Sequence, residues 1–214
     1  MSGFPIVVSG LARCGSSMVM KMLVVGGLKL TGGNAGLPLM EDDRASWLPR
    51  DPGWMRDLTS DHAIKILGID RTRPPRWFRA RIIWMDRDRG EQVKSILKYR
   101  DARGHAVPAY NYPRMKKNLK ARTEKCLKIV RKISGGKYIR LNFEDVLANP
   151  LDAAKKIAAL LERDMDVELM AQVVIKRPPE CLPGIPDLDP RMTHTIKGDS
   201  DGITNTGDTN YVVD

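Results

Sequence analysis

Short, largely apolar segments recur along the first two thirds of the chain, which is typical of buried strands. They cover residues 6–9, 63–67, 81–85 and 137–141. Segments with helical periodicity separate or follow them, at residues 16–25, 90–103, 113–133, 151–161 and 167–174. Strands that alternate with helices predict an α/β fold with three αβα layers around a central parallel sheet.

The regular pattern is interrupted by one long loop and stops before the end of the chain. Residues 31–53 carry Gly, Pro and acidic side chains without a period, and Pro, Gly, Asp and Thr dominate from residue 176 onward. A length of 214 residues suits one domain. We therefore expect an α/β domain over residues 1–175 and an irregular segment over 176–214 that packs on or extends from it.

The charge balance adds a preference for anionic partners. Lys and Arg number 36 against 26 Asp and Glu, which gives a net charge of +10. Residues 111–140 contain eleven of the cations and a single acid, Glu124, so this segment alone carries the whole excess. Such a run usually forms a solvated helix face, although part of it could steer an anionic donor or an acidic acceptor.

The cysteines and the apolar runs bear on the location of the protein. Cys14, Cys126 and Cys181 are too few for a disulfide framework and show no metal-ligand spacing. No basic segment precedes the apolar start, and Lys21 interrupts the next apolar run. These features predict a soluble, cytoplasmic protein without a metal site or a membrane partner.

The strongest local signal is the segment SGLARCGSS at positions 9–17, between the first predicted strand and the first predicted helix. Gly10 and Gly15 have the GxxxxG spacing of a phosphate-binding loop, where backbone N–H groups and a helix N-terminus meet an anion. Ser16 and Ser17 add hydroxyls, but Ser16 stands where nucleoside triphosphatases need Lys. The alternative is a tight turn capped by Ser16.

This loop resembles the 5′-phosphosulfate loop of sulfotransferases, with Ala12 in place of Pro and Cys14 in place of Ser. The resemblance implies a P-loop-like sulfotransferase fold. It places Arg13, Cys14, Gly15, Ser16 and Ser17 around the 5′ end of the donor nucleotide. At a helix N-terminus the Cys14 thiol could have a lowered pKa, although we favour the interpretation that it is simply a small residue.

A second motif follows the third predicted strand, in the segment MDRDRGEQVKS at positions 85–95. It resembles the 3′-phosphate segment of sulfotransferases, in which an Arg at the strand end precedes a Ser on the next helix by eight residues. Arg87 and Ser95 have that spacing and offer a guanidinium and a hydroxyl to phosphate oxygens. Asp86 permits another interpretation, the magnesium-holding segment of P-loop NTPases, which the missing Lys of the loop disfavours.

The resemblance, which extends over residues 5–175, implies transfer of a sulfuryl group from 3′-phosphoadenosine 5′-phosphosulfate (PAPS) to a hydroxyl or amine. Arg13 would stabilise the leaving group, and Lys65 would face the sulfuryl group unless it points to the surface. Glu41 is the candidate base. The alternative is that Glu41 is only one carboxylate of a solvated acidic loop. His62 and His105 are other candidates for the base.

Two other functions remain open from the sequence. One is a nucleotide kinase or NTPase with a degenerate loop, and the other is a non-enzymatic module that binds nucleic acid through its basic surplus. Only 6% of the residues are aromatic, and no nucleic-acid motif is present, which disfavours the second. The acceptor of the sulfotransferase would be a small molecule or a glycan, with an acidic one compatible with the charge. The sequence leaves the oligomeric state open.

Overall fold

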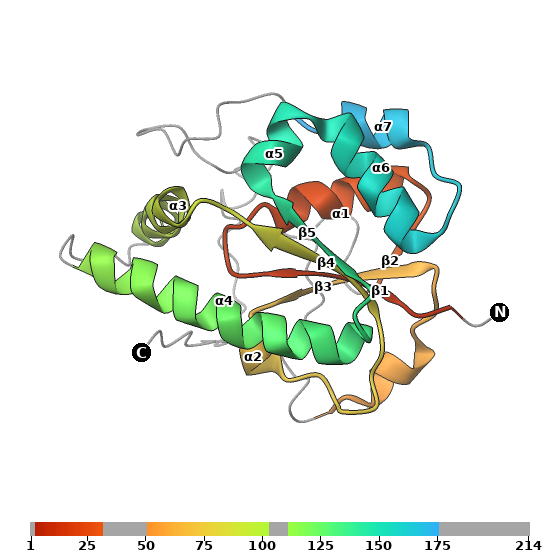
Figure 1. The fold of residues 1–214 in the computed structure, drawn as a ribbon, viewed down its shortest axis with the longest axis horizontal. Helices are drawn as coiled ribbons and strands as arrows, with labels where there is room; N and C mark the ends of the chain where they lie inside the picture. The colour runs from red at the N-terminus through yellow and green to blue at the C-terminus, as the bar shows by residue number, and fades with distance from the viewer. Residues whose placement is uncertain (1–2, 32–50, 103–110, 176–214) are drawn as a thin grey trace, which may run out of the picture.

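A five-stranded sheet forms the centre of the protein (Figure 1). The computed structural model describes residues 3–31, 51–102 and 111–175. The strands are β1 (Ile6–Gly10), β2 (Lys29–Leu30), β3 (His62–Leu67), β4 (Arg81–Asp86) and β5 (Tyr138–Asn142). Their order is β2-β3-β1-β4-β5, and every pair is parallel. The predicted parallel α/β architecture is therefore confirmed.

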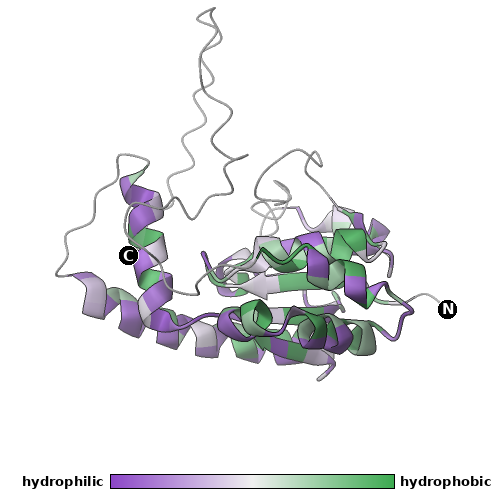
Figure 2. Ribbon diagram, turned by 90° about the horizontal axis from the view of Figure 1, so that it is seen from above, coloured by the Kyte–Doolittle hydropathy of each residue, from purple (hydrophilic) through white to green (hydrophobic). Residues whose placement is uncertain are grey.

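Helices cover both faces of this sheet (Figure 1). They are α1 (Ser16–Val25), α2 (Ile69–Thr72), α3 (Arg89–Asp101), α4 (Tyr112–Ser134), α5 (Phe143–Ala148), α6 (Pro150–Leu161) and α7 (Val167–Gln172), with a 3-10 turn at Gly53–Asp57. Helices α1, α5, α6 and α7 pack on one face, and α2 and α4 pack on the other. The layers stand apart when the molecule is seen from above (Figure 2).

The sheet has a hydrophobic core on each of its faces, because successive side chains of a strand point to opposite faces. Val8 and Ile83 pack with α1 and α6, whereas Val7 and Ile82 pack with α4. Both sets are fully buried. Burial on both faces explains why these strands read as continuous apolar runs rather than as alternating patterns.

Four elements were not predicted from the sequence, namely β2, α2, α5 and the 3-10 turn at Gly53–Asp57. The predicted segment 176–214 and most of the predicted loop 31–53 lie outside the described residues. Within the described ranges, no helix combines the length and the apolar character that a bilayer span needs.

The topology directs attention to the carboxyl end of β1. The chain places β3 on one side of β1 and then crosses to place β4 on the other side. In open α/β sheets, ligands bind in the crevice where the direction of winding reverses, outside the carboxyl ends of the strands. The loop after β1 and the junction after β4 both lie at this edge.

Candidate functional site

The loop between β1 and α1 is tightly built around its two glycines. A Cβ at Gly10 would lie 2.5 Å from Cys14 Sγ and 2.8 Å from the Met85 carbonyl oxygen. Gly15 has a φ of +92°, and its Cβ would lie 2.4 Å from the Phe143 ring. Both positions therefore exclude any side chain, as expected for a loop whose backbone must approach a ligand closely.

Hydrogen bonds from neighbouring elements hold the loop in place. Gly68 N, just after β3, donates to Gly10 O at 2.9 Å. From α3, Gln92 Nε2 donates to Ala12 O at 2.9 Å. Contacts with the end of β3 and the start of α3, which lie beside the loop in space, thus hold its conformation.

The amino terminus of α1 has no side-chain cap. Its N-cap residue is Gly15, which has no side chain to cap the helix. A cap at Ser16 is therefore wrong, because Ser16 is already the first residue of the helix, although the segment does form a tight strand-to-helix turn. An uncapped helix start at the end of a glycine loop offers N–H donors and a partial positive charge to an anion.

The two predicted phosphate motifs are joined by direct contacts. Arg13 Nε donates to Ser95 Oγ at 3.1 Å, and Arg87 Nη1 donates to the Arg13 carbonyl oxygen at 3.3 Å. The guanidinium of Arg13 lies 5.3 Å from the centre of the Tyr99 ring, and that of Arg87 lies 4.6 Å from the centre of the Phe143 ring. Two arginines from separate motifs are thus held against aromatic rings at one edge of the sheet.

Lys65 reaches the same edge from β3. Its side chain is only 2% exposed, and Nζ donates to Ser17 Oγ at 3.0 Å. The alternative of a surface-facing strand lysine is therefore wrong. Because an ammonium group is costly to bury without an anionic or polar partner, its position beside the first turn of α1 fits an anion-binding role.

Cys14 points away from the mouth of the loop. Its side chain is buried in the core beside α1, and burial raises the pKa of the thiol despite the nearby Ser16 and Lys65. A lowered pKa at this helix start is therefore wrong, and the interpretation of Cys14 as a small packing residue holds. Contact with a ligand at this position would come from the backbone rather than from the thiol.

Asp86 is held between two arginines. Arg89 Nη2 donates to its Oδ1 at 2.9 Å, and Arg140 Nε donates to its Oδ2 at 3.0 Å. Burial alone would raise the pKa of Asp86, but the hydrogen bonds from Arg140 and Arg89 outweigh it, so the pKa is lowered. The carboxylate thus braces β4 against β5 and the start of α3.

Of the three candidates for the base, only His62 lies within the described residues. His62 is the first residue of β3 and contacts Thr59, at the opposite end of the strand from the loop. A role for His62 as base is therefore wrong. Glu41 and His105 lie outside the described residues. Among the residues that the structure describes, no group of His, Cys, Asp and Glu is arranged to hold a metal ion.

Three residues of the site were missed from the sequence: Gln92, Tyr99 and Phe143. Tyr99 follows Ser95 by four residues, so the helical period could have placed both on one face of α3. Gln92 likewise lies on the helix that carries Ser95. No sequence signal links Phe143, which follows β5, to the loop after β1.

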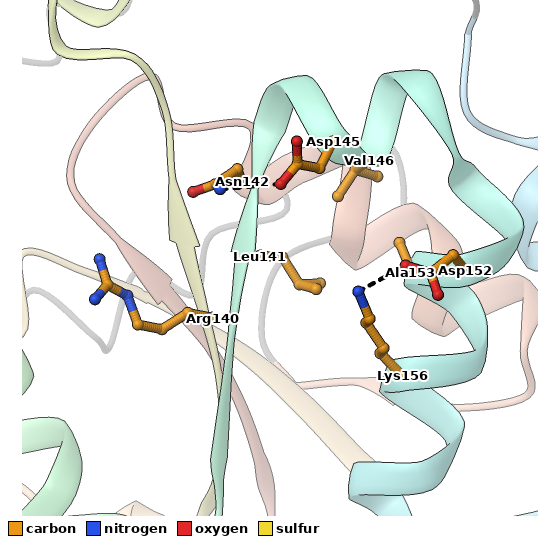
Figure 3. Close-up of a pocket in the computed structure, with 8 residues that line it drawn as sticks. All are labelled: Arg140, Leu141, Asn142, Asp145, Val146, Asp152, Ala153 and Lys156. Carbon is orange, nitrogen blue, oxygen red and sulfur yellow. Dashed lines mark hydrogen bonds and ion pairs between the residues drawn. The ribbon is translucent and has the colours of Figure 1, made fainter.

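A hollow beside β5 is separate from this site (Figure 3). Its volume is about 40 Å³, and it lies between β5, α5 and α6. Lys156 on its wall forms an ion pair with Asp152 at 2.7 Å, and the Arg140 side chain points away from the other lining residues (Figure 3). A space of this size admits water but no nucleotide.

Comparisons with known proteins agree with the architecture. No protein-family model and no curated protein matches the chain. Among solved structures, sulfotransferase STF9 from Mycobacterium avium matches with a TM-score of 0.50 and 10% identity, over 81% of this chain and 67% of that chain. Mouse sulfotransferase SULT7A1 complexed with PAP matches with a TM-score of 0.49 and 14% identity, over 79% of this chain and 62% of the mouse protein. The match to STF9 agrees with a sulfotransferase fold for this chain. The chain spans 67% of STF9 and 62% of the mouse protein.

Proposed function

We propose that this protein is a sulfotransferase that moves a sulfuryl group from PAPS to a hydroxyl or amine of an acceptor. The observation that carries the proposal is the joining of the two phosphate motifs through Arg13, which contacts both Ser95 and Arg87. A nucleotide with phosphate groups at its 5′ and 3′ positions needs two anion sites side by side on one edge of the sheet.

The residues present fit such a donor. The uncapped start of α1, with Gly15, Ser16 and Ser17, would receive the 5′ end, and the backbone of Cys14 would take part. Arg87 and Ser95 would hold the 3′-phosphate, because a guanidinium and a hydroxyl match phosphate oxygens in charge and geometry. The contact of Arg87 with Phe143 fixes the direction of this guanidinium.

Transfer requires positive charge where the leaving phosphate oxygen becomes more negative. We assign this task to Arg13 on the loop and place Lys65 beside the transferred group, where Ser17 orients its ammonium. PAPS supplies the activated sulfuryl group when it is bound. The protein contributes fixed cations, together with alignment of donor and acceptor.

The nucleotide kinase alternative is less well supported. In that interpretation Asp86 would hold a magnesium ion, but its two oxygens accept hydrogen bonds from Arg89 and Arg140. A cation at Asp86 would have to displace both arginines. The loop also lacks the lysine after Gly15 that such enzymes use.

The test of this function is the thermal unfolding of the protein with each class of nucleotide. We expect 3′-phosphoadenosine 5′-phosphate without magnesium to raise Tm by about 5 to 10 °C at a hundredfold excess over Kd. ATP with magnesium should give a much smaller rise, because it lacks the 3′-phosphate that Arg87 and Ser95 would hold. Stabilisation by ATP with magnesium alone would overturn the proposal.

We propose Glu41 as the base that takes the proton from the acceptor. Glu41→Gln keeps the shape and removes the basic oxygen, so turnover should fall by a factor of about 10² to 10⁴, while affinity for 3′-phosphoadenosine 5′-phosphate stays the same. Steady-state kinetics and a nucleotide titration measure the two effects. Equal turnover in Glu41→Gln and the unaltered protein would remove Glu41 from this role.

A further inference from the structure

Helix α4 carries a largely basic face on the side turned away from the sheet. Its buried side chains, among them Leu119, Cys126 and Val130, pack on the sheet. Eight of its cations are exposed. Arg131 donates to Tyr138 Oη, and Lys116 lies about 100° around the helix from Lys117. We call the other six the basic face: Arg114, Lys117, Lys120, Lys125, Lys128 and Lys132.

The helical period brings these six cations into one stripe. At 3.6 residues per turn, Lys117 and Lys128 point within about 20° of each other, and the other four lie within about 80° of Lys117. The rise of 1.5 Å per residue makes the stripe about 27 Å long. The six cations span about 140° around the helix, and the exposed acid Glu124 lies among them, within about 20° of Lys117. The face is therefore a linear track with a large excess of positive charge.

Within the part of the chain that the structure describes, no ion pair involves any of these six residues. Two other cations of residues 111–140 behave differently. Arg122 on the same helix binds Asp70, and Arg140 on β5 binds Asp86. Exposed cations also lie elsewhere, Lys29, Arg76 and Lys155 among them, but the basic face gathers six of them on one helix.

The track begins beside the candidate donor site. Tyr112 Oη, in the first turn of α4, donates to Gly90 O at 3.0 Å, and Gly90 lies in α3 just after Arg87. The amino-terminal half of α4 extends past the carboxyl ends of the strands (Figure 1), and the view from above agrees (Figure 2). A linear molecule on the basic face would therefore have one end close to the loop after β1.

We propose that the basic face of α4 binds an acidic polysaccharide and that this polysaccharide is the sulfuryl acceptor. The inference rests on the proposed function and adds the class of its acceptor. A polyuronate chain supplies regularly spaced negative charge for the track and hydroxyl groups for the reaction within one molecule. Binding along α4 would deliver those hydroxyls to the carboxyl edge of the sheet.

The chemistry of the face favours a polysaccharide over single-stranded nucleic acid and over insertion into a membrane. No large apolar or aromatic side chain is exposed on the described residues of α4, so unpaired bases have nothing to stack on. The apolar side of α4 is already buried against the sheet, so the helix has no hydrophobic face left to insert into a membrane.

The experiment measures the binding of a short labelled polyuronate as a function of salt, without donor. A variant with Lys117→Gln, Lys120→Gln and Lys125→Gln should bind about tenfold more weakly, and the slope of log K against log salt should fall by about two. The matched control carries Lys29→Gln, Arg76→Gln and Lys155→Gln, which removes the same charge from exposed sites away from α4. The control should bind as the unaltered protein does.

The outcomes separate this inference from the proposed function. Equal loss in both variants, or tighter binding of an oligothymidylate of equal charge than of the polyuronate, would overturn the inference. If 3′-phosphoadenosine 5′-phosphate still bound, the proposed function would stand without it. If the polyuronate bound through α4 but received no sulfuryl group from PAPS, its role as acceptor would be refuted. Circular dichroism should show both variants folded, because all six substituted side chains are exposed.

Discussion

Lys65→Met should lower the rate of sulfuryl transfer by a factor of about 10² to 10³ while leaving the protein folded. Methionine has nearly the volume of lysine but no charge, and the lysine ammonium is buried beside Ser17. Removing a buried charge relieves its desolvation cost, so the free energy of unfolding should stay the same or rise. Turnover and urea unfolding, measured on the same preparation, test both parts.

Lys29→Met is the matched control, because Lys29 lies on the neighbouring strand β2 and is exposed. It should change neither turnover nor stability. A Lys65→Met protein that transfers sulfuryl groups at the full rate would show that Lys65 has only a structural role. Weakened nucleotide affinity with unchanged kcat would instead assign Lys65 to donor binding.

Gly15→Ala should destabilise the fold by about 3 kcal/mol and weaken nucleotide binding. A left-handed conformation costs an alanine about 1 kcal/mol, and overpacking against a buried ring costs about 1 to 3 kcal/mol. The new methyl group would press on Phe143, whose ring supports the Arg87 guanidinium. Urea unfolding measures the first effect, and titration with 3′-phosphoadenosine 5′-phosphate measures the second.

Gly27→Ala separates the two contributions. Gly27 has a φ of +95°, close to that of Gly15, but a Cβ there meets nothing within 4 Å. Its cost should be the backbone strain alone, about 1 kcal/mol. Adding Phe143→Leu to Gly15→Ala should restore part of the stability. If both alanine variants lost the same free energy of unfolding, the Phe143 ring would move aside without cost, and the close contact would not contribute to the destabilisation.

The sequence predicted the long elements well and the short ones poorly. The apolar runs at 63–67 and 81–85 became β3 and β4 with a shift of one residue at one end of each. Strand β2 was missed because two residues cannot show a period, and its pairing with β3 is a tertiary contact. Helix α5 was missed because it begins at Phe143, directly after β5, with no glycine or proline to mark the change.

The candidate site was predictable in its parts but not in its connections. The glycine spacing marked the loop, and the spacing of Arg87 and Ser95 marked the second motif. The contacts of Arg13 with Ser95 and of Phe143 with Gly15 join segments far apart in the chain, so no local pattern encodes them. The burial of Lys65 also depends on which face of the sheet its side chain meets, which alternation alone leaves open. The burial of Cys14 depends on the path of the loop after β1.

The central position of β1 has a consequence for how the protein is made. Ser9 of β1 bonds to Ile66 of β3, 57 residues later, and β1 also pairs with β4. No strand of the described sheet is paired through a hairpin, so every pairing must close a long stretch of chain. During synthesis, the loop after β1 emerges first but acquires its shape only after β4 and Phe143 have followed it. A nascent chain that ends before β4 would therefore contain the sequence of the phosphate motif but could not form the folded site.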